Sequence, residues 1–449
     1  MTNKIFGTDG IRSTVNKEPL TASTILKVAQ ATGLQFMRGD HRHLVVIAKD
    51  TRLSGYMVEP ALTAGFTSVG MDVILVGPMP TPAVSMLIRS LRADLGVMIS
   101  ASHNPAEDNG IKIFGPDGRK LPDSIEKEIE NKISNLEESD LVNPANLGRA
   151  RRLDDAPGRY IEHIKSTFPK GKTLQGLKII IDCANGAAYK IAPTVLWELG
   201  ADIISIGDDP DGHNINKNCG ATATEALKRS VVDNKAHIGI ALDGDADRII
   251  VSDEKGNIVD GDQIIASLAR YLQKENKLNK NTVVTTQMSN IGLEHYLTKK
   301  NIKMIRTQVG DRYVTAEMFK NGYNLGGEQS GHIILSDYGT TGDGLLAGLQ
   351  VLSLLVDSNK PASDILQKFN PVPQLLKNYR FKNINLLENT SVKDCMDTAE
   401  EKLSKAKGRL LIRKSGTEPL VRVMAECEDS ELLISIIDDI ILCLKENDT

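Results

Sequence analysis

Cysteine is scarce in this sequence and follows no pairing pattern. The chain of 449 residues has five cysteines, an odd number, and no two of them stand close together. Neither a disulfide framework nor a zinc site is therefore expected, and we expect reduced and mostly buried thiols. The five residues are Cys183, Cys219, Cys395, Cys427 and Cys443.

Long apolar runs and blocks of one charge are missing as well. No stretch approaches the roughly 20 apolar residues of a membrane span, and residues 1–9 lack the basic and apolar regions of a signal peptide. The formal charge of −4 is mild, and Lys and Arg form no stripe, which argues against nucleic-acid binding. We expect a cytoplasmic protein with no membrane or nucleic-acid partner, in which a local pocket captures any anionic substrate.

The composition is that of a protein that folds throughout. Hydrophobic residues make up 41% and charged residues 25% of the chain, as in ordinary globular proteins. A single hydrophobic core stops growing at about 250–300 residues. A chain of this length is therefore expected to divide into about three or four domains.

Short apolar runs alternate with longer amphipathic segments in three successive rounds. This alternation is typical of mostly parallel sheets covered by helices. The predicted strands are 44–48, 73–76, 95–99, 179–182, 202–206, 238–243, 282–286, 303–308 and 324–326. The predicted helices are 54–69, 81–91, 187–199, 224–233, 262–274 and 313–321.

The end of the chain has a different pattern. The predicted strands 409–413 and 421–426 are joined by a polar turn, and 430–446 is a predicted helix that Ser430 could cap. Two prolines within 367–378 favour an extended linker ahead of this part. We expect a smaller α+β domain here.

Three segments repeat one pattern, which indicates related domains. The segments that start at Gly110, Asp247 and Gly331 each place a predicted strand after, or at the end of, a polar loop. If the domains are related, their loops stand at equivalent positions and can converge on one cleft. Chance similarity of the three segments is the alternative. We therefore expect three related α/β domains with mostly parallel mixed sheets, followed by a smaller α+β C-terminal domain, around a central active-site cleft. The expected domains are 1–154, 155–254, 255–367 and 368–449.

Three aspartates alternate in the loop after one buried strand. Asp243, Asp245 and Asp247 crowd oxygen donors together, and a hard divalent cation would offset their repulsion. Mg²⁺ suits phosphate chemistry. A calcium EF-hand is less suitable, because Arg248 replaces the turn glycine and the flanks are predicted strands. A solvated acidic turn is the other alternative.

The segment 99–113 leaves the end of a predicted strand, where open α/β sheets place their ligands. It offers Ser102 as a nucleophile, with His103 beside it. Adjacent side chains seldom form a good nucleophile–base pair, and the Asn104–Pro105 pair is also an ordinary turn signal. From these residues alone, a simple turn remains the stronger interpretation.

Two later loops offer groups for a phosphorylated sugar. Glu328, Ser330 and His332 would suit recognition of sugar hydroxyls or an amine. Near the end of the chain a polar turn joins two predicted strands, and its backbone N–H groups, hydroxyls and flanking arginines can point at one anion. A capped hairpin with solvated charges is the alternative. The residues of this predicted phosphate loop are Arg413, Ser415, Gly416, Thr417 and Arg422.

Together the four loops resemble those of the α-D-phosphohexomutase superfamily, whose domains contribute in order a phosphoserine loop, a metal loop, a sugar loop and a phosphate loop. The matching motifs stand at 100–105, 243–248, 327–332 and 413–419. The sequence is most similar to the bacterial phosphoglucosamine mutase branch, through segments at 6–12, 309–314 and 326–332. Ser13 departs from the glycine that is usual in that branch.

The resemblance implies a phosphoryl-transfer site shared by the domains. It implies that Ser102 carries the phosphate and joins the three aspartates of the metal loop in binding one Mg²⁺ ion. Lys112 or His103 would serve as general acid or base, without a division of roles. The residues implied to line the transfer site are Arg12, His103, Lys112 and Arg248.

The resemblance also implies an activity. It is the interconversion of glucosamine-6-phosphate and glucosamine-1-phosphate, with glucosamine-1,6-bisphosphate as intermediate, in the supply of amino-sugar nucleotides and cell-wall precursors. A phosphomannomutase or phosphoglucomutase, a serine-dependent phosphatase and a sugar-phosphate-binding sensor are the alternatives. The oligomeric state, a homodimer included, stays open.

Overall fold

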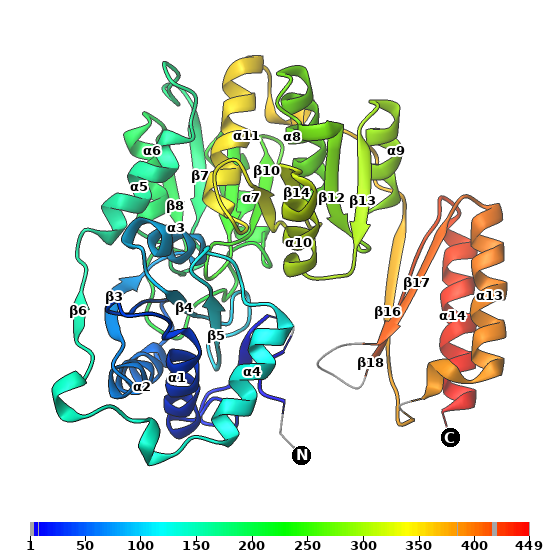
Figure 1. Cartoon of the computed structure of the whole chain (residues 1–449). Helices are drawn as coiled ribbons and strands as arrows, with labels where there is room; N and C mark the ends of the chain where they lie inside the picture. Colours follow the sequence, from blue (N-terminus) through cyan, green and yellow to red (C-terminus); the bar gives the residue numbers. More distant parts are fainter. Residues whose placement is uncertain (1–3, 8, 384, 415–419, 449) are drawn as a thin grey trace.

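The computed structural model describes residues 4–7, 9–383, 385–414 and 420–448. Four sheets organise the chain, and Figure 1 shows three α/β units gathered together with a C-terminal unit at one side. The predicted fold class is confirmed, because three α/β units with mixed sheets precede a smaller α+β unit. Within the described ranges no helix has the length and apolar character of a transmembrane segment.

The first unit is built on a six-stranded sheet. Its strands are β1 (Ile11–Thr14), β2 (Leu44–Lys49), β3 (Asp72–Pro78), β4 (Leu95–Ile99), β5 (Asp108–Phe114) and β6 (Ala150–Arg152). Its helices are α1 (Ala22–Phe36), α2 (Gly55–Ser68), α3 (Thr81–Leu91) and α4 (Asp123–Ser134). The strand order is β1-β5-β4-β2-β3-β6.

The second unit has five strands in its sheet. These are β7 (Lys178–Asp182), β8 (Asp202–Ile206), β9 (Ile238–Leu242), β10 (Ile249–Asp253) and β11 (Ile258–Val259). Its helices are α5 (Ala156–Ser166), α6 (Ile191–Glu198) and α7 (Glu225–Asp233). The order is β11-β10-β9-β7-β8.

The third unit has four strands. These are β12 (Thr282–Thr286), β13 (Lys303–Thr307), β14 (Leu325–Gly327) and β15 (Ile333–Leu335). Its helices are α8 (Gly261–Lys274), α9 (Ile291–Lys299), α10 (Asp311–Asn321), α11 (Gly344–Ser358) and α12 (Ala362–Leu366). The order is β13-β12-β14-β15.

All three units share one strand topology. Three strands are parallel, the third lies beside the first, and a fourth strand runs antiparallel next to the third. The loops that join the third strand to the fourth are 100–107, 243–248 and 328–332. The predicted equivalence of the three loops is therefore confirmed, and each leaves the carboxyl end of a parallel strand, where α/β sheets hold ligands.

One apolar core runs through these three units. It includes buried residues of each sheet, such as Met98, Ile240 and Val283. Strands β4 and β9 are buried at every position, as expected for parallel strands with both faces covered. Helix α11 packs against β9 and β10 of the second unit. The shared core thus fixes the three loops relative to one another.

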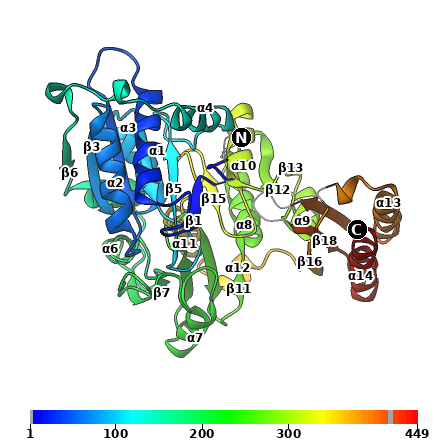
Figure 2. The same ribbon diagram turned by 90° about the horizontal axis from the view of Figure 1, so that it is seen from below.

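The C-terminal unit has its own core and a purely antiparallel sheet of order β16-β18-β17. Its elements are β16 (Gln374–Arg380), α13 (Thr390–Lys405), β17 (Arg409–Lys414), β18 (Leu420–Glu426) and α14 (Ser430–Asn447). Its sheet faces the other units and its helices lie outside (Figure 1). Figures 1 and 2 both place it beside the third unit, where Glu426 accepts a hydrogen bond from the N–H of Ile291 at 3.2 Å.

Two local predictions about this unit need correction. The predicted linker 367–378 ends early, because β16 begins at Gln374 and pairs with β18. The cap of α14 is Asp429 rather than Ser430, since the Asp429 carboxylate accepts hydrogen bonds from the first turn. In both cases an interaction with neighbouring backbone decided the boundary.

A substitution at Gly344 can test how tightly α11 packs against the 243–248 loop. A Cβ at this position would lie 2.3 Å from the carbonyl oxygen of Arg248, so the backbone would have to move. We expect Gly344→Ala to lower the free energy of unfolding by about 1–3 kcal/mol. The matched control is Gly158→Ala in α5, where a Cβ meets nothing within 4 Å. Gly158→Ala should raise the free energy of unfolding by roughly 0.5–1 kcal/mol. Urea unfolding of both variants measures the free energy of unfolding. Equal changes in Gly344→Ala and Gly158→Ala would contradict tight packing of α11 against the 243–248 loop.

Candidate active site

Ser102 lies in the loop at the carboxyl end of β4, with a φ of 54°. Residues other than glycine are uncommon in this left-handed region, and such positions concentrate at functional sites. Ser102 is 1% exposed, and its hydroxyl donates a hydrogen bond to Oδ2 of Asp243 at 2.6 Å. The candidate nucleophile of the first unit therefore touches the aspartate loop of the second.

Arg52 fixes the backbone of the Ser102 loop. The Nε of Arg52 donates a hydrogen bond to Oδ2 of Asp50 at 2.9 Å. The sequence analysis missed Arg52, although it follows the predicted strand 44–48 at the same edge of the sheet as Ser102. The buried guanidinium donates to four carbonyl oxygens of the loop, those of Ser102 (3.0 Å), Asn104 (2.9 Å), Asp108 (3.1 Å) and Pro105.

The three aspartates are buried together. Asp243, Asp245 and Asp247 each bring one ligand oxygen within 4.8 Å of the others. Oδ1 of Asp245 and Oδ1 of Asp247 are buried and accept no hydrogen bond from any residue that the structure describes. Burial and the two neighbouring carboxylates raise the pKa of Asp243 to about 8. Crowded oxygens without partners fit a hard divalent cation such as Mg²⁺.

Two residues of the first unit donate hydrogen bonds to the aspartate loop. Lys112 of β5 donates to Asp245 at 2.7 Å and to Asp247 at 2.9 Å. Burial would lower the pKa of Lys112, but Asp245 and Asp247 raise it well above its ordinary value. Thr81 at the start of α3, which the sequence analysis missed, donates its N–H to the carbonyl oxygen of Asp245 at 2.9 Å.

His103 and Arg248 contact these groups, and Arg12 is close enough for its charge to act on His103. Nδ1 of His103 is 3.4 Å from the hydroxyl oxygen of Ser102. Burial and the charges of Arg248 and Arg12 lower the pKa of His103 to about 4, so its ring is neutral at neutral pH. The N–H of Arg248 donates to Oδ1 of Asp243 at 3.2 Å.

His332 of the third unit lies beside the aspartate loop of the second unit. Its Nδ1 lies 3.7 Å from Oδ1 of Asp247, and its Nε2 lies 3.3 Å from Oδ2 of Asp311. Glu328 is largely enclosed, and burial raises its pKa. Ser330 is exposed. Of the three predicted sugar-loop residues, His332 has the direct contact with the aspartate loop.

A chain of ion pairs joins the first and third units. Lys120 contacts Asp9 and lies 2.6 Å from Oδ2 of Asp311. Asp9 in turn contacts Arg12, and its Oδ2 lies 3.6 Å from Nζ of Lys112. Lys120, Asp9 and Asp311 were not among the predicted site residues. The two acids stand in segments that carried the family resemblance, which was the available signal.

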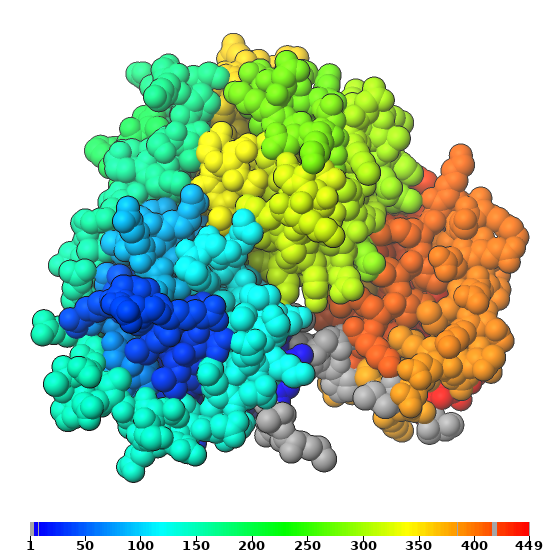
Figure 3. All heavy atoms as spheres, in the orientation of Figure 1, coloured from blue at the N-terminus to red at the C-terminus, as the bar shows by residue number. Residues whose placement is uncertain are grey.

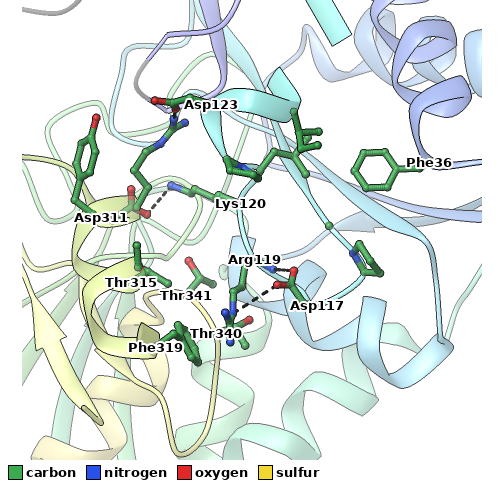
Figure 4. A pocket seen from close by; sticks show the side chains of 18 of the residues that line it. Phe36, Asp117, Arg119, Lys120, Asp123, Asp311, Thr315, Phe319, Thr340 and Thr341 are labelled. Carbon is green, nitrogen blue, oxygen red and sulfur yellow. Dashed lines mark hydrogen bonds and ion pairs between the residues drawn. The ribbon is translucent and has the colours of Figure 1, made fainter. Parts of the chain in front are cut away.

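A cavity of about 800 Å³ opens beside this ion pair. Figure 4 shows Lys120 and Asp311 at its wall, between a loop of the first unit and α10. Inside it the guanidinium of Arg119 lies 3.5 Å from the ring centre of Phe319. Ser102 is not among the described residues that line the cavity, but the wall residues Lys120 and Asp311 contact Asp9 and His332 beside the transfer site.

The C-terminal unit contributes a pair of arginines. Arg413 of β17 and Arg422 of β18 are directly opposite each other in the antiparallel register. Burial and the charge of Arg422 lower the pKa of Arg413. Like charges directly opposite are unfavourable, and an anion between them would offset this. Figure 3 shows the surface hollowed between this unit and the first. Ser415, Gly416 and Thr417 of the predicted phosphate loop lie outside the described residues.

Comparisons with known proteins agree over the whole chain. Family models of phosphoglucomutase/phosphomannomutase match in order: domain I at 3–140, domain II at 158–256, domain III at 260–372 and the C-terminal domain at 376–442. The phosphoglucosamine mutase of Paramagnetospirillum magneticum is 60% identical, with 98% of each chain covered. That of Parvibaculum lavamentivorans is 58% identical, with 100% of each covered.

Solved structures share the fold. A phosphoglucomutase/phosphomannomutase family protein from Burkholderia thailandensis has a TM-score of 0.83 at 25% identity, covering 99% of this chain and 97% of its own. The N-acetylphosphoglucosamine mutase of Aspergillus fumigatus, in complex with GlcNAc-6P and magnesium, has a TM-score of 0.70 at 18% identity, covering 99% and 96%. At that identity the second likeness shows the fold alone.

The role of Arg52 can be tested by removing its side chain. Arg52→Ala leaves Asp50 buried without its partner, and loss of one member of a buried pair costs about 3–5 kcal/mol of stability. The matched control is Arg159→Ala, whose ion pair with Asp155 is exposed and worth less than about 1 kcal/mol. In the milder Arg52→Lys variant, hydrogen exchange of residues 100–108 should rise more than in other loops. Unchanged exchange there would show that Arg52 does not hold the loop.

Proposed function

The chain belongs to the bacterial phosphoglucosamine mutases of the phosphoglucomutase/phosphomannomutase family, and from that premise we propose that it interconverts glucosamine-6-phosphate and glucosamine-1-phosphate through a phosphorylated Ser102. The observation that carries this proposal is the buried hydrogen bond from Ser102 to Asp243. It joins a nucleophile of the first unit to a cation-binding group of the second. The proposed substrate, a small phosphorylated amino sugar, rests on the likeness to phosphoglucosamine mutases.

The proposed chemistry is two phosphoryl transfers at one oxygen. In the first, the bond between phosphorus and Oγ of Ser102 breaks and a bond to a sugar hydroxyl oxygen forms. The hydroxyl proton passes to a neutral base, for which His103 is suited because its ring is neutral at neutral pH and its Nδ1 lies 3.4 Å from Oγ of Ser102. Lys112 holds its proton and is suited to the role of general acid. The resulting glucosamine-1,6-bisphosphate turns around, and its other phosphoryl group moves to Oγ while the sugar oxygen regains a proton. The protein mainly positions the groups and neutralises their charge.

Asp243, Asp245 and Asp247, together with Ser102, are the residues that would hold one Mg²⁺ ion. The two buried carboxylate oxygens without hydrogen-bond partners among the described residues support this assignment. When bound, the ion supplies positive charge to the phosphoryl group that is being transferred. Lys112 already bridges two of the three carboxylates, so its ammonium adds a second positive charge at the same place.

The arginine pair of the C-terminal unit is proposed to hold the phosphate that is not reacting. Arg413 and Arg422 can form charge-assisted hydrogen bonds to one phosphate. One such site serves both transfers, because the bisphosphate presents its two phosphates in turn. The antiparallel register places the two arginines opposite each other, and two cationic side chains at one place suit an anionic ligand.

Loss of the phosphate carrier should abolish turnover. Ser102→Ala should lower kcat by several orders of magnitude, because no other group stores the phosphoryl group while the sugar turns around. The matched control is Ser100→Ala in the same loop, where the hydroxyl accepts a hydrogen bond from the N–H of Ser102 at 2.9 Å. This variant should keep most of its activity and its phosphate. Intact-mass measurement and a coupled glucosamine-phosphate assay test both variants, and phosphate found on Ser100 would refute the assignment.

Recognition of the amine is proposed to depend on Glu328. A charge-assisted hydrogen bond is worth roughly 1.5–3 kcal/mol against about 1 for a neutral one. Glu328→Gln should therefore narrow the preference for glucosamine-6-phosphate over glucose-6-phosphate by about tenfold in kcat/KM. Glu225→Gln, an exposed change on α7, is the matched control and should leave the ratio unchanged. Equal losses for the two sugars would mean that Glu328 binds hydroxyls common to both.

A further inference from the structure

The amino-terminal edge of the first sheet carries a polar cluster that the transfer site does not use. His43 directly precedes β2 and Asp94 directly precedes β4, and β2 and β4 are parallel neighbours. The N–H of Leu44 donates to Oδ2 of Asp94 at 2.8 Å, and the N–H of Asp94 donates to the carbonyl oxygen of Leu44 at 2.9 Å. The backbone therefore fixes both residues at the edge opposite to Ser102.

Asp94 presents its other oxygen to two imidazoles. Nε2 of His41 lies 2.7 Å from Oδ1 of Asp94, and Nδ1 of His43 lies 3.4 Å from the same oxygen. One ligand atom of each side chain lies within 4.8 Å of the other two. The two rings meet edge to face, with centroids 4.3 Å apart. Two ring nitrogens and one carboxylate oxygen thus converge on one point.

A surface ion pair alone does not explain His43. This residue is 6% exposed, and its Nδ1 is buried with no hydrogen-bond partner in the described part of the chain. Buried polar atoms are ordinarily satisfied, and the 3.4 Å contact with Asp94 leaves Nδ1 of His43 without a well-formed hydrogen bond. A cation between the three side chains would give every one of these atoms a partner.

The surrounding charges favour a positive ligand. Arg42, which stands between the two histidines in the sequence, forms an ion pair with Asp72 at the start of β3, so its charge is already balanced. Burial opposes ionisation of Asp94, but the N–H of Leu44 and the two histidines hold its pKa below the ordinary value. Asp94 thus offers the carboxylate oxygen of the cluster as a ligand atom.

We propose that His41, His43 and Asp94 form a site for a borderline divalent cation such as Zn²⁺, separate from the aspartate loop. Imidazole nitrogens suit Zn²⁺, Co²⁺ and Ni²⁺, whereas Mg²⁺ prefers oxygen ligands. The His41 side chain is 57% exposed, so water can complete the coordination. A bound ion ties the segment before β2 to the segment before β4 and stabilises the first unit.

Titration of the full chain in saturating Mg²⁺, with Zn²⁺ and Co²⁺ as probes, tests the proposal. We expect about one ion bound beyond the Mg²⁺ site, visible d–d bands with Co²⁺, and a higher unfolding temperature with Zn²⁺. His41→Ala and Asp94→Asn should each weaken binding at least about tenfold and remove the thermal shift. Both variants should fold, since His41 is exposed and asparagine still accepts the Leu44 hydrogen bond.

Two controls separate this site from other binding. His295→Ala removes an exposed histidine of α9 and should bind Zn²⁺ like the wild type. Asp245→Asn alters the aspartate loop and should leave the additional ion in place. The proposal is wrong if the wild type takes up no additional ion, if His41→Ala and Asp94→Asn bind as tightly as the wild type, or if either control removes the binding.

Discussion

Mutual repulsion among three buried carboxylates is the constraint around which the three α/β units are arranged. Asp243, Asp245 and Asp247 are at most 3% exposed, and burying unpaired charge is costly unless opposite charges or a cation lie nearby. The first unit supplies Lys112 from β5, and the third supplies His332. The charge balance of one loop thus depends on residues from all three units, so the site is complete only where the three units pack together.

The repeated topology makes this convergence geometrically natural. Each unit ends its third parallel strand at a loop and returns through an antiparallel strand. Loops at equivalent positions carry different chemistry: a serine in the first unit, carboxylates in the second and a histidine in the third. Because one apolar core spans the three units, small shifts of one loop are resisted by packing in the others. The arginines sit on a unit with its own core, so packing separate from that of the three α/β units positions this part of the site.

The two edges of the first sheet have different roles. Its carboxyl edge carries Ser102 in a left-handed backbone conformation, held by a buried arginine. Strain of this kind persists only where surrounding contacts over-determine it, and the four carbonyl contacts of Arg52 provide that support. Its amino edge is held instead by reciprocal backbone contacts between Leu44 and Asp94. Rigidity at both edges keeps the serine loop in place between the other units.

The sequence by itself determined the alternation of strands and helices, the fold class and the four chemical loops, because these are local patterns of hydrophobicity and spacing. Only the tertiary structure decided which side chains meet. Arg52 and Ser102 are separated by 50 residues, and Ser102 and Asp243 by 141, so no local pattern reveals either pair. The family resemblance had linked Ser102 to the three aspartates, but nothing in the sequence linked it to Arg52. Thr81 and the Lys120–Asp311 ion pair were missed for the same reason. Such contacts depend on how separate sheets are oriented, which is set by core packing that distant parts of the chain build together.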